Sequence, residues 1–252
     1  NIISFNPKSL ESIEDVIFSL EEPFGDLIIC ANYLLSNYAS RKVSVVLSGE
    51  GGDESFIGYD HQRAFLKMYG YSKNSIMNFL INLSLSFLPS NLISLASGYP
   101  GKFSKSEKNQ IKRTFSSLSS PESAYLSLVT LFDQKELSML FNSSFYENSP
   151  MKPDNKPIKE IFNIDNHIWQ SVMRAEIEQF TLIINLLEQD RFGMRFSLES
   201  RVPLVSKDIL NFAGSLPIEE LLNEKNKKLL LNYSNIKAMK KKPFSVFASP
   251  NY

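Results

Sequence analysis

The hydrophobic and polar positions along the chain predict a mostly helical protein with a short strand near its N-terminal end. Apolar residues recur at helical spacing over residues 27–39, LIICANYLLSNYA, which predicts a helix. Residues 43–47 are too short a run for a helix and rich in valine, so they predict a buried strand. Further helices are expected over residues 59–69, 175–188 and 207–213 and over most of the remaining chain.

Proline, glycine and serine mark the expected loops between helices, at residues 89–101, 117–121 and 142–157. One stretch, residues 74–101, carries no charged residue and resembles a membrane segment. Asn78, Asn82 and Pro89 interrupt its apolar residues, and a span needs about 20 consecutive apolar residues. We therefore expect a buried helix over residues 74–88 that ends before Pro89, rather than a membrane or partner-docking surface.

Composition is that of a globular protein. The chain has 252 residues, of which 43% are hydrophobic, enough for one large domain or two small ones. Lys+Arg and Asp+Glu both number 27, so net charge gives no argument for nucleic acid, and we expect no nucleic-acid partner. The one cysteine, Cys30, lies among apolar residues, which predicts a buried structural thiol in a reducing compartment. The N-terminal residues do not resemble a signal peptide, and a cytoplasmic location is expected.

The loop after the predicted strand carries the first candidate chemistry. Residues 48–54, SGEGGDE, mix three glycines with three carboxylates. A helix followed by a strand and such a loop indicates an α/β crossover, whose ligands bind beyond the carboxyl end of the strand. Glycines let backbone N–H groups approach phosphate oxygens, and carboxylates can hold Mg²⁺. The loop matches neither a Walker A motif nor a dinucleotide fingerprint. From the residues alone, a tight turn capped by Asp53 is an equal alternative.

A second constellation lies at residues 190–203, DRFGMRFSLESRVP, where both signs of charge occur among apolar residues. Half-buried acids and arginines persist only when they are paired. A structural ion-pair network between the helices on either side therefore explains Glu199 and Arg201 at least as well as contact with a ligand.

Together these motifs resemble the synthetase domain of the glutamine-dependent asparagine synthetase family, whose patterns are LSGEGGDELFGGY and DR-sM--SLE-RvPfLD. The order and separation of the motifs agree. Weaker similarity extends upstream to EPFGD at residues 22–26 and downstream to LNFAGSLP at 210–217, KLLL at 228–231 and KKPF at 241–244. The chain departs from the family patterns at several positions: Ser55, Ile57 for the first glycine of Gly-Gly, Val205 and Ser206 for Leu-Asp, Asn232 for Arg, and Pro243 for Gly.

The resemblance implies that ATP activates a carboxylate, such as aspartate, as an acyl-adenylate, and that ammonia from glutamine then displaces AMP. ATP and Mg²⁺ are the implied cofactors. Catalytic roles are implied for Glu50, beside the reacting carboxyl, and for Lys228, which would stabilise developing charge. Nucleotide or pyrophosphate contacts are implied for Ser48, Gly49, Gly51, Gly52, Asp53, Asp190 and Arg191, with Asp53 also the metal ligand. The lysine-rich segment from residue 225 onward suits a triphosphate, but Lys228 itself is assigned only by the resemblance.

The fold class expected is α/β and mostly helical, part of an ATP-pyrophosphatase-like domain with a doubly wound parallel sheet. Residues 1–252 would form the C-terminal portion of this synthetase domain, with the pyrophosphate loop and glutaminase domain upstream, and the fragment alone is expected to be inactive. Residues 43–47 would then be an inner strand, most of whose neighbours lie outside this chain. A homodimer is one possible assembly.

Three alternatives stay open. The first is an enzyme that amidates another carboxylate, such as a sugar acid or a peptide side chain. A β-lactam or lasso-type cyclase is disfavoured, because Glu50 is retained where β-lactam synthetases have tyrosine. Ser206 and Asn232 favour the third alternative, a degenerate nucleotide-binding or interaction subunit.

Overall fold

The computed structural model describes residues 13–22, 28–72, 105–130, 132, 134–141, 156–164 and 167–222. The chain divides into two units, which are described separately. Unit 1 comprises Asn1–Ser55, Ile177–Ser215 and Lys227–Tyr252, and unit 2 comprises Phe56–Glu176 and Leu216–Asn226. The expected helix over residues 74–88 and the implied catalytic residue Lys228 both lie outside the described residues.

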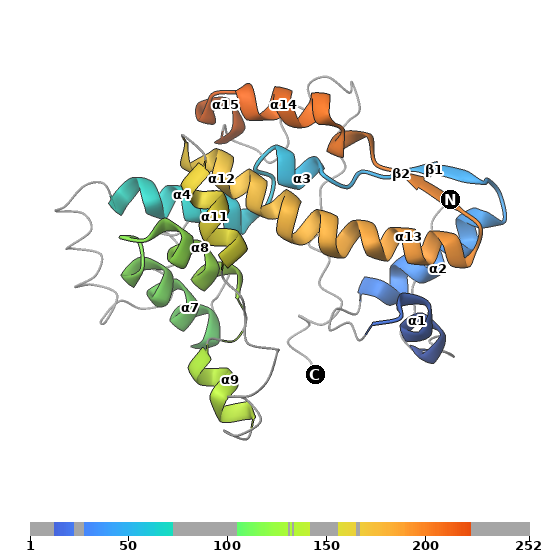
Figure 1. The fold of residues 1–252 in the computed structure, drawn as a ribbon, viewed down its shortest axis with the longest axis horizontal. Coiled ribbons are helices and arrows are strands. Elements are labelled where there is room, and N and C mark those ends of the chain that lie inside the picture. The colour runs from blue at the N-terminus through green and yellow to red at the C-terminus, as the bar shows by residue number, and fades with distance from the viewer. Residues whose placement is uncertain are drawn as a thin grey trace. The chain divides into compact units, whose positions relative to one another are not determined.

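Unit 1 contains the predicted helix–strand–loop order and a second strand (Figure 1). Its elements are α1 (Ile13–Leu20), α2 (Ile28–Ser40), β1 (Val45–Leu47), α3 (Gly52–Ser55), most of the π-helix η2 (Glu176–Asn185), α13 (Leu186–Arg195), β2 (Glu199–Arg201), the 3-10 helix η3 (Pro203–Val205) and α14 (Lys207–Ser215). The core joins α1, α2 and α13 through Val16, Leu20, Ile29, Cys30 and Phe192. Cys30 is fully buried, as predicted, and burial raises the pKa of its thiol.

The two strands lie side by side and run parallel, with Val46 opposite Ser200 (Figure 1). The pairing continues at both ends, where Glu199 N–H donates to Ser44 O at 2.8 Å and Ser48 N–H donates to Arg201 O at 2.8 Å. In the described residues the sheet has these two strands alone. The chain is therefore α/β and mostly helical, with a small parallel sheet.

The sequence prediction of a buried strand is wrong for β1. Val45 is 39% exposed and Leu47 is 75% exposed, because among the described residues β1 has a hydrogen-bonded neighbour on one edge alone. The sequence analysis also missed β2. The residues of β2, Glu-Ser-Arg, form no apolar run, so their strand conformation follows from pairing with β1 rather than from local pattern.

The second motif, residues 190–203, was expected to lie between two helices, but its first residues belong to a helix. The helix predicted over residues 175–188 continues as α13 to Arg195, so residues 190–195 are helical. The chain then turns sharply into β2 through Ser197, whose φ is +55°. Gly193 permits this turn, because a β-carbon at this position would overlap the carbonyl oxygen of Leu198. An ion-pair network between helices was one of two explanations for Glu199 and Arg201. Among the described residues these two side chains instead pair with each other, at 2.8 Å on the exposed side of β2.

The elements of unit 2 are all helices within its described residues. Its elements are α4 (Asp60–Ser72), α7 (Lys105–Ser116), α8 (Pro121–Val129), α9 (Gln134–Leu140), α11 (Lys156–Ile164), α12 (Ile168–Ala175) and α15 (Ile218–Leu222). Pro121 begins α8 and Pro157 is the second residue of α11, positions where the missing N–H costs no helical hydrogen bond. The expected loops at these prolines therefore end one or two residues earlier than predicted.

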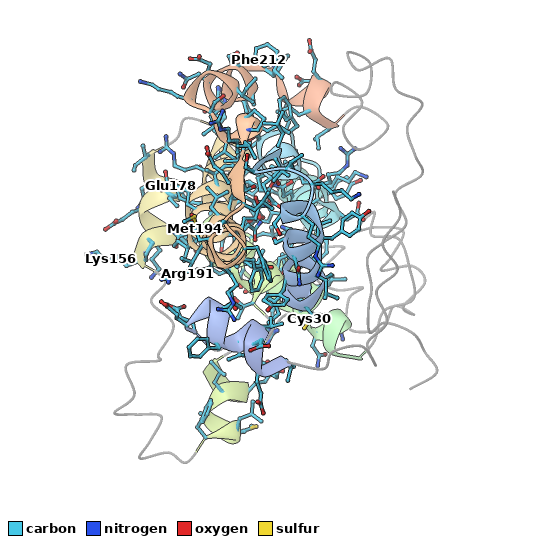
Figure 2. The ribbon with its side chains drawn as sticks, turned by 90° about the vertical axis from the view of Figure 1, so that its right-hand side faces the viewer. Cys30, Lys156, Glu178, Arg191, Met194 and Phe212 are labelled. Atoms are coloured by element: carbon cyan, nitrogen blue, oxygen red, sulfur yellow. The ribbon has the colours of Figure 1, made fainter. Side chains whose placement is uncertain are left out.

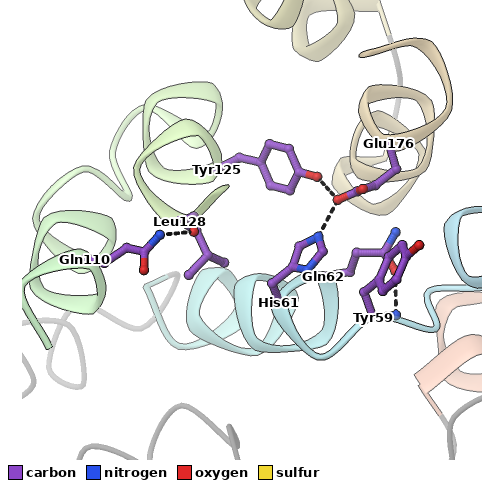
Figure 3. Close-up of polar contacts among 7 residues, drawn as sticks. All are labelled: Tyr59, His61, Gln62, Gln110, Tyr125, Leu128 and Glu176. Atoms are coloured by element: carbon purple, nitrogen blue, oxygen red, sulfur yellow. Dashed lines mark hydrogen bonds and ion pairs between the residues drawn. The ribbon is translucent and has the colours of Figure 1, made fainter. Parts of the chain in front are cut away.

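An aromatic cluster of Phe65, Tyr125 and Phe162 fills the interior of unit 2. Glu176 lies beside it and accepts hydrogen bonds from the Tyr125 hydroxyl and from His61 Nε2, the latter at 2.5 Å (Figure 3). Gln110 Nε2 donates to Leu128 O at the end of α8, at 2.5 Å (Figure 3). Among the described residues, no helix is long and apolar enough to cross a membrane.

Candidate functional site

The site lies where β1 ends and the SGEGGDE loop begins. Ser48 leaves the sheet after its N–H donates to Arg201 O, and Gly52 N–H closes a turn on Gly49 O at 3.3 Å. This turn leads into the short helix α3. The carboxyl end of a parallel strand is where α/β proteins place ligands, and this loop occupies that position.

A pocket of about 340 Å³ opens beside this loop. It is enclosed by α2, the end of β1, α13 and β2, all elements of unit 1. Its walls are apolar at Leu35, Ala39, Val46, Leu47, Phe192 and Leu198 and polar at Asn32, Ser36, Ser48, Glu50, Gln189 and Ser200. An apolar pocket with a few converging polar groups is the usual form of a small-molecule site.

Glu50 is the charged residue of this pocket and is half-buried. Burial raises the pKa of its carboxyl, and the neighbouring charges of Glu54 and Asp53 raise it further. Hydrogen bonds from the side chains of Asn185 and Gln189 oppose this shift, with Asn185 Nδ2 lying 3.2 Å from Glu50 Oε2. Two neutral amides thus stabilise the ionised form of a carboxyl whose ionisation burial disfavours.

Gln189 connects the loop to β2. Its Nε2 donates to Ser48 Oγ at 3.0 Å, and its Oε1 accepts from Ser200 Oγ at 2.9 Å. Behind it, Asn32 Nδ2 of α2 donates to Glu188 Oε1 of α13 at 2.7 Å. These hydrogen bonds link α13 to the loop, to β2 and to α2, and so fix the walls of the pocket relative to one another.

Gly51 sets the course of the loop. Its φ is +88°, a conformation that favours glycine, and a β-carbon here would lie 2.5 Å from Val205 Cγ2. Gly52 is buried at the start of α3, whereas Gly49 is exposed and has open space around the position of a β-carbon. Gly51 therefore serves close packing on η3, and Gly49 is the one whose surroundings would admit a ligand.

Asp53, the implied Mg²⁺ ligand, is half-buried in α3 and is not among the residues that line the pocket. Within the described ranges, no group of three His, Cys, Asp or Glu side chains is arranged to hold a metal ion. A Mg²⁺ ion at Asp53 would therefore take its remaining ligands from phosphate and water. That is how Mg²⁺ usually binds in nucleotide sites, so a single carboxylate fits this ion.

The residues Asp190 and Arg191 lie on α13 outside this pocket. Asp190 is exposed and lines a smaller hollow of about 230 Å³ that also contacts Gln189 and Ser200. Arg191 reaches toward α1 and pairs with Glu21, which follows that helix (Figure 2). The structure thus brings Ser48 and Glu50 together in one pocket. The prediction that Asp53 and Lys228 share their cleft stays a prediction.

Sequence reasoning missed the polar side chains that α13 and β2 bring to the loop: Asn185, Gln189 and Ser200. Asn185 and Gln189 are four residues apart and so lie on one helical face. This spacing was a usable signal, since Gln189 directly precedes the quoted second motif. Their partners are 135 and 141 residues away in sequence, however, and no local pattern identifies them.

Comparison with known proteins gives one family match. The family model described as asparagine synthase matches residues 2–235. The asparagine synthetase (glutamine-hydrolyzing) 1 of Bacillus subtilis is 25% identical over 224 residues, which cover 83% of this chain and 30% of that protein. The protein named "Putative asparagine synthetase (glutamine-hydrolyzing) 2" of Methanocaldococcus jannaschii is 47% identical over 49 residues, 19% of this chain and 10% of its own length.

The chain thus spans under a third of the length of these relatives. No solved structure matches it.

Proposed function

The chain belongs to the asparagine synthase family, and from this premise we propose that the protein uses ATP to activate a carboxylate and converts it to an amide. The observation that carries the proposal is the pocket at the end of β1, where Ser48 and Glu50 of the SGEGGDE loop meet. The carboxylate would attack the α-phosphorus of ATP and release pyrophosphate. Ammonia would then attack the acyl carbon of the adenylate and release AMP.

The pocket supports the binding of the adenylate. Its volume of about 340 Å³ falls in the range of small-molecule sites, and its apolar wall suits a flat ring. Gly49, between the lining residues Ser48 and Glu50, offers exposed backbone. Mg²⁺, when bound with the nucleotide, would neutralise phosphate charge, and Asp53 is the residue proposed to hold it. Lys228, and with it Asp190 and Arg191, are proposed nucleotide contacts on the family pattern.

Glu50 is proposed to accept the proton that attacking ammonia loses. Its raised pKa makes it a stronger base than an exposed carboxylate, and the amides of Asn185 and Gln189 hold it in place. Groups of this kind usually contribute about 10²-fold or more to rate.

Aspartate is the proposed carboxylate, and ammonia released from glutamine is the proposed nitrogen source. The names of both relatives describe glutamine-hydrolyzing asparagine synthetases, which supports this choice. A doubly wound parallel sheet, of which β1 and β2 would be part, and a cytoplasmic location belong to the same proposal.

The test is exchange of labelled pyrophosphate into ATP by the full-length protein, with AMP and amide release followed in parallel. Candidate carboxylates are supplied one at a time, with aspartate first and sugar acids and peptide acids after it. We expect exchange that depends on one carboxylate and on Mg²⁺. If no carboxylate stimulates exchange or AMP release, the ligase function is wrong and a non-catalytic nucleotide-binding role replaces it.

Two isosteric variants separate the steps. Asp53→Asn should weaken nucleotide use, with a defect that depends on Mg²⁺ concentration. Glu50→Gln should retain ATP binding and lose about 10²-fold in amide formation. Both proteins should remain folded. Full activity of Glu50→Gln, or no effect from either variant, would show that the loop is structural.

A further inference from the structure

Gln189 has both of its polar atoms engaged at the pocket wall. Nε2 donates to Ser48 Oγ at 3.0 Å, and Oε1 accepts from Ser200 Oγ at 2.9 Å. The side chain thereby spans from α13 to the loop on one side and to β2 on the other. All three residues line the pocket, so the Gln189 amide forms part of the wall that a ligand would contact.

The Ser48 hydroxyl receives two hydrogen bonds in this arrangement. One comes from Gln189 Nε2, and the other comes from the Glu50 backbone N–H at 3.3 Å. A serine hydroxyl has one hydrogen to donate and two lone pairs to accept with. Because both lone pairs are occupied, what Ser48 can offer a ligand in the pocket is its O–H, as a donor.

The orientation of the Gln189 amide follows from its neighbours. The Gln189 side chain lowers the pKa of the Glu50 carboxyl by hydrogen bonding, and an ionised carboxylate can only accept hydrogen bonds. The NH₂ group must therefore face Glu50 and Ser48, and the carbonyl oxygen faces the Ser200 hydroxyl. Reversal of the amide would direct its oxygen at the carboxylate, which is repulsive.

We propose that Gln189 is a positioning residue of the adenylate site, because it holds the Ser48 hydroxyl as a hydrogen-bond donor toward an acceptor atom of the ligand. This inference rests on the proposed function and deepens it. The acceptor is an oxygen or ring nitrogen of the adenylate. With Gln189 removed, a lone pair of Ser48 Oγ becomes free and the hydroxyl can rotate away from the pocket.

The test is a double-mutant cycle on AMP binding, measured by calorimetry on the full-length protein. Ser48→Ala removes the donor and should weaken AMP binding about tenfold, the usual scale for one hydrogen bond. Gln189→Met keeps the size of the side chain without adding charge and should weaken AMP binding about threefold to tenfold. In the Ser48→Ala background, Gln189→Met should have no further effect on AMP binding, because the hydroxyl that it positions is gone. Glu50, the acidic neighbour of Gln189, is proposed to act on the acyl group, which AMP lacks.

Two further variants guard against a general structural effect. Ser200→Ala removes the anchor of the Gln189 carbonyl and should weaken AMP binding less than Gln189→Met, again with no effect in the Ser48→Ala background. Gln179→Met makes the same substitution ten residues earlier, in η2 and outside the pocket, and should leave AMP affinity unchanged. Melting temperatures of all variants are measured alongside.

The outcomes separate the two proposals. If the unmodified protein binds AMP and the effects of Ser48→Ala and Gln189→Met multiply, Gln189 acts on the fold and its positioning role is overturned. Equal affinity of Gln189→Met and the unmodified protein overturns it too. If the unmodified protein binds neither AMP nor MgATP, the adenylating function itself fails and the positioning role falls with it.

Discussion

Each unit of the molecule contains a carboxylate that is at least half-buried, Glu176 in unit 2 and Glu50 in unit 1, and the surroundings of the two differ. In unit 2, Glu176 is 3% exposed and accepts hydrogen bonds from Tyr125 and His61. In unit 1, Glu50 is half-buried, is held by the amides of Asn185 and Gln189, and borders an open pocket. Glu176 is enclosed by ionisable donors and aromatic rings, whereas Glu50 is held by neutral groups and keeps a face open to a ligand.

The comparison distinguishes an acid with a structural environment from one that we propose acts in the chemistry. Enclosure and strong donors make Glu176 a connection to α4 and α8 within unit 2. Neutral amides orient Glu50 without cancelling its charge, so the charge remains available for chemistry. Loss of Glu176 should therefore reduce stability, and loss of Glu50 should reduce activity.

The largest expected effect on stability is that of Glu176→Ala. Removal of one partner from a buried charged cluster typically costs about 3–5 kcal/mol, because the remaining groups stay buried without it. Urea unfolding followed by circular dichroism measures this loss. Glu178→Ala, two residues further along and exposed, is the matched control and should change stability by less than about 0.5 kcal/mol. Equal small effects would remove the distinction between the two acids.

The next effect concerns the walls of the Glu50 pocket. Gly193→Ala would bring a methyl group against the Leu198 carbonyl, and such overpacking should cost about 1–3 kcal/mol. Gly214→Ala, in α14 of the same unit, has open space and should stabilise by up to about 1 kcal/mol. Opposite signs in thermal unfolding would show that close approach, not helix propensity, selects glycine at residue 193.

Tyr125→Phe tests the hydrogen bond that the Tyr125 hydroxyl donates to the buried Glu176 carboxylate. Burial, followed by the charge of Glu176, raises the pKa of the Tyr125 hydroxyl well above its usual value. At neutral pH the variant should lose about 1–3 kcal/mol, the cost of one hydrogen bond to a charged group. Because the folded-state pKa is raised, the contribution of Tyr125 is complete below the unfolded pKa of about 10 and is lost as pH rises toward the folded value.

Melting temperatures between pH 8 and pH 11 check this dependence. The unmodified protein should lose stability above about pH 10 more steeply than Tyr125→Phe. Parallel curves would mean that the hydroxyl is not enclosed.

The smallest effect is a gain in stability from Glu50→Gln. The pKa of Glu50 is raised in the folded state, so its ionised form opposes folding above the unfolded pKa of about 4.3. The variant should therefore melt slightly higher than the unmodified protein at pH 7. The difference should vanish as pH falls below 4. A lower melting temperature for Glu50→Gln at pH 7 would place Glu50 with Glu176 among the structural acids.

Part of the fold and site followed from local pattern. The helix at residues 27–39, the burial of Cys30 and the position of SGEGGDE after a strand were all predicted, because each depends on a few neighbouring residues. Ile57 shows what a family pattern indicates about backbone conformation. It stands where that pattern has glycine, and its φ of +51° is a conformation that favours glycine. The pattern therefore records a backbone geometry that this chain reaches with a fully buried isoleucine.

The sequence by itself determined which residues are the candidates for the chemistry, since Ser48 and Glu50 lie in a loop whose glycines and acids are adjacent in the chain. Tertiary structure alone decided what surrounds them. It made a strand of Glu199–Arg201, exposed one side of β1, and brought Asn185 and Gln189 to the loop from 135 and 141 residues away. Asparagine, glutamine and serine have no periodicity that identifies a distant partner, so the groups that orient Glu50 and Ser48 become recognisable only when the chain has folded.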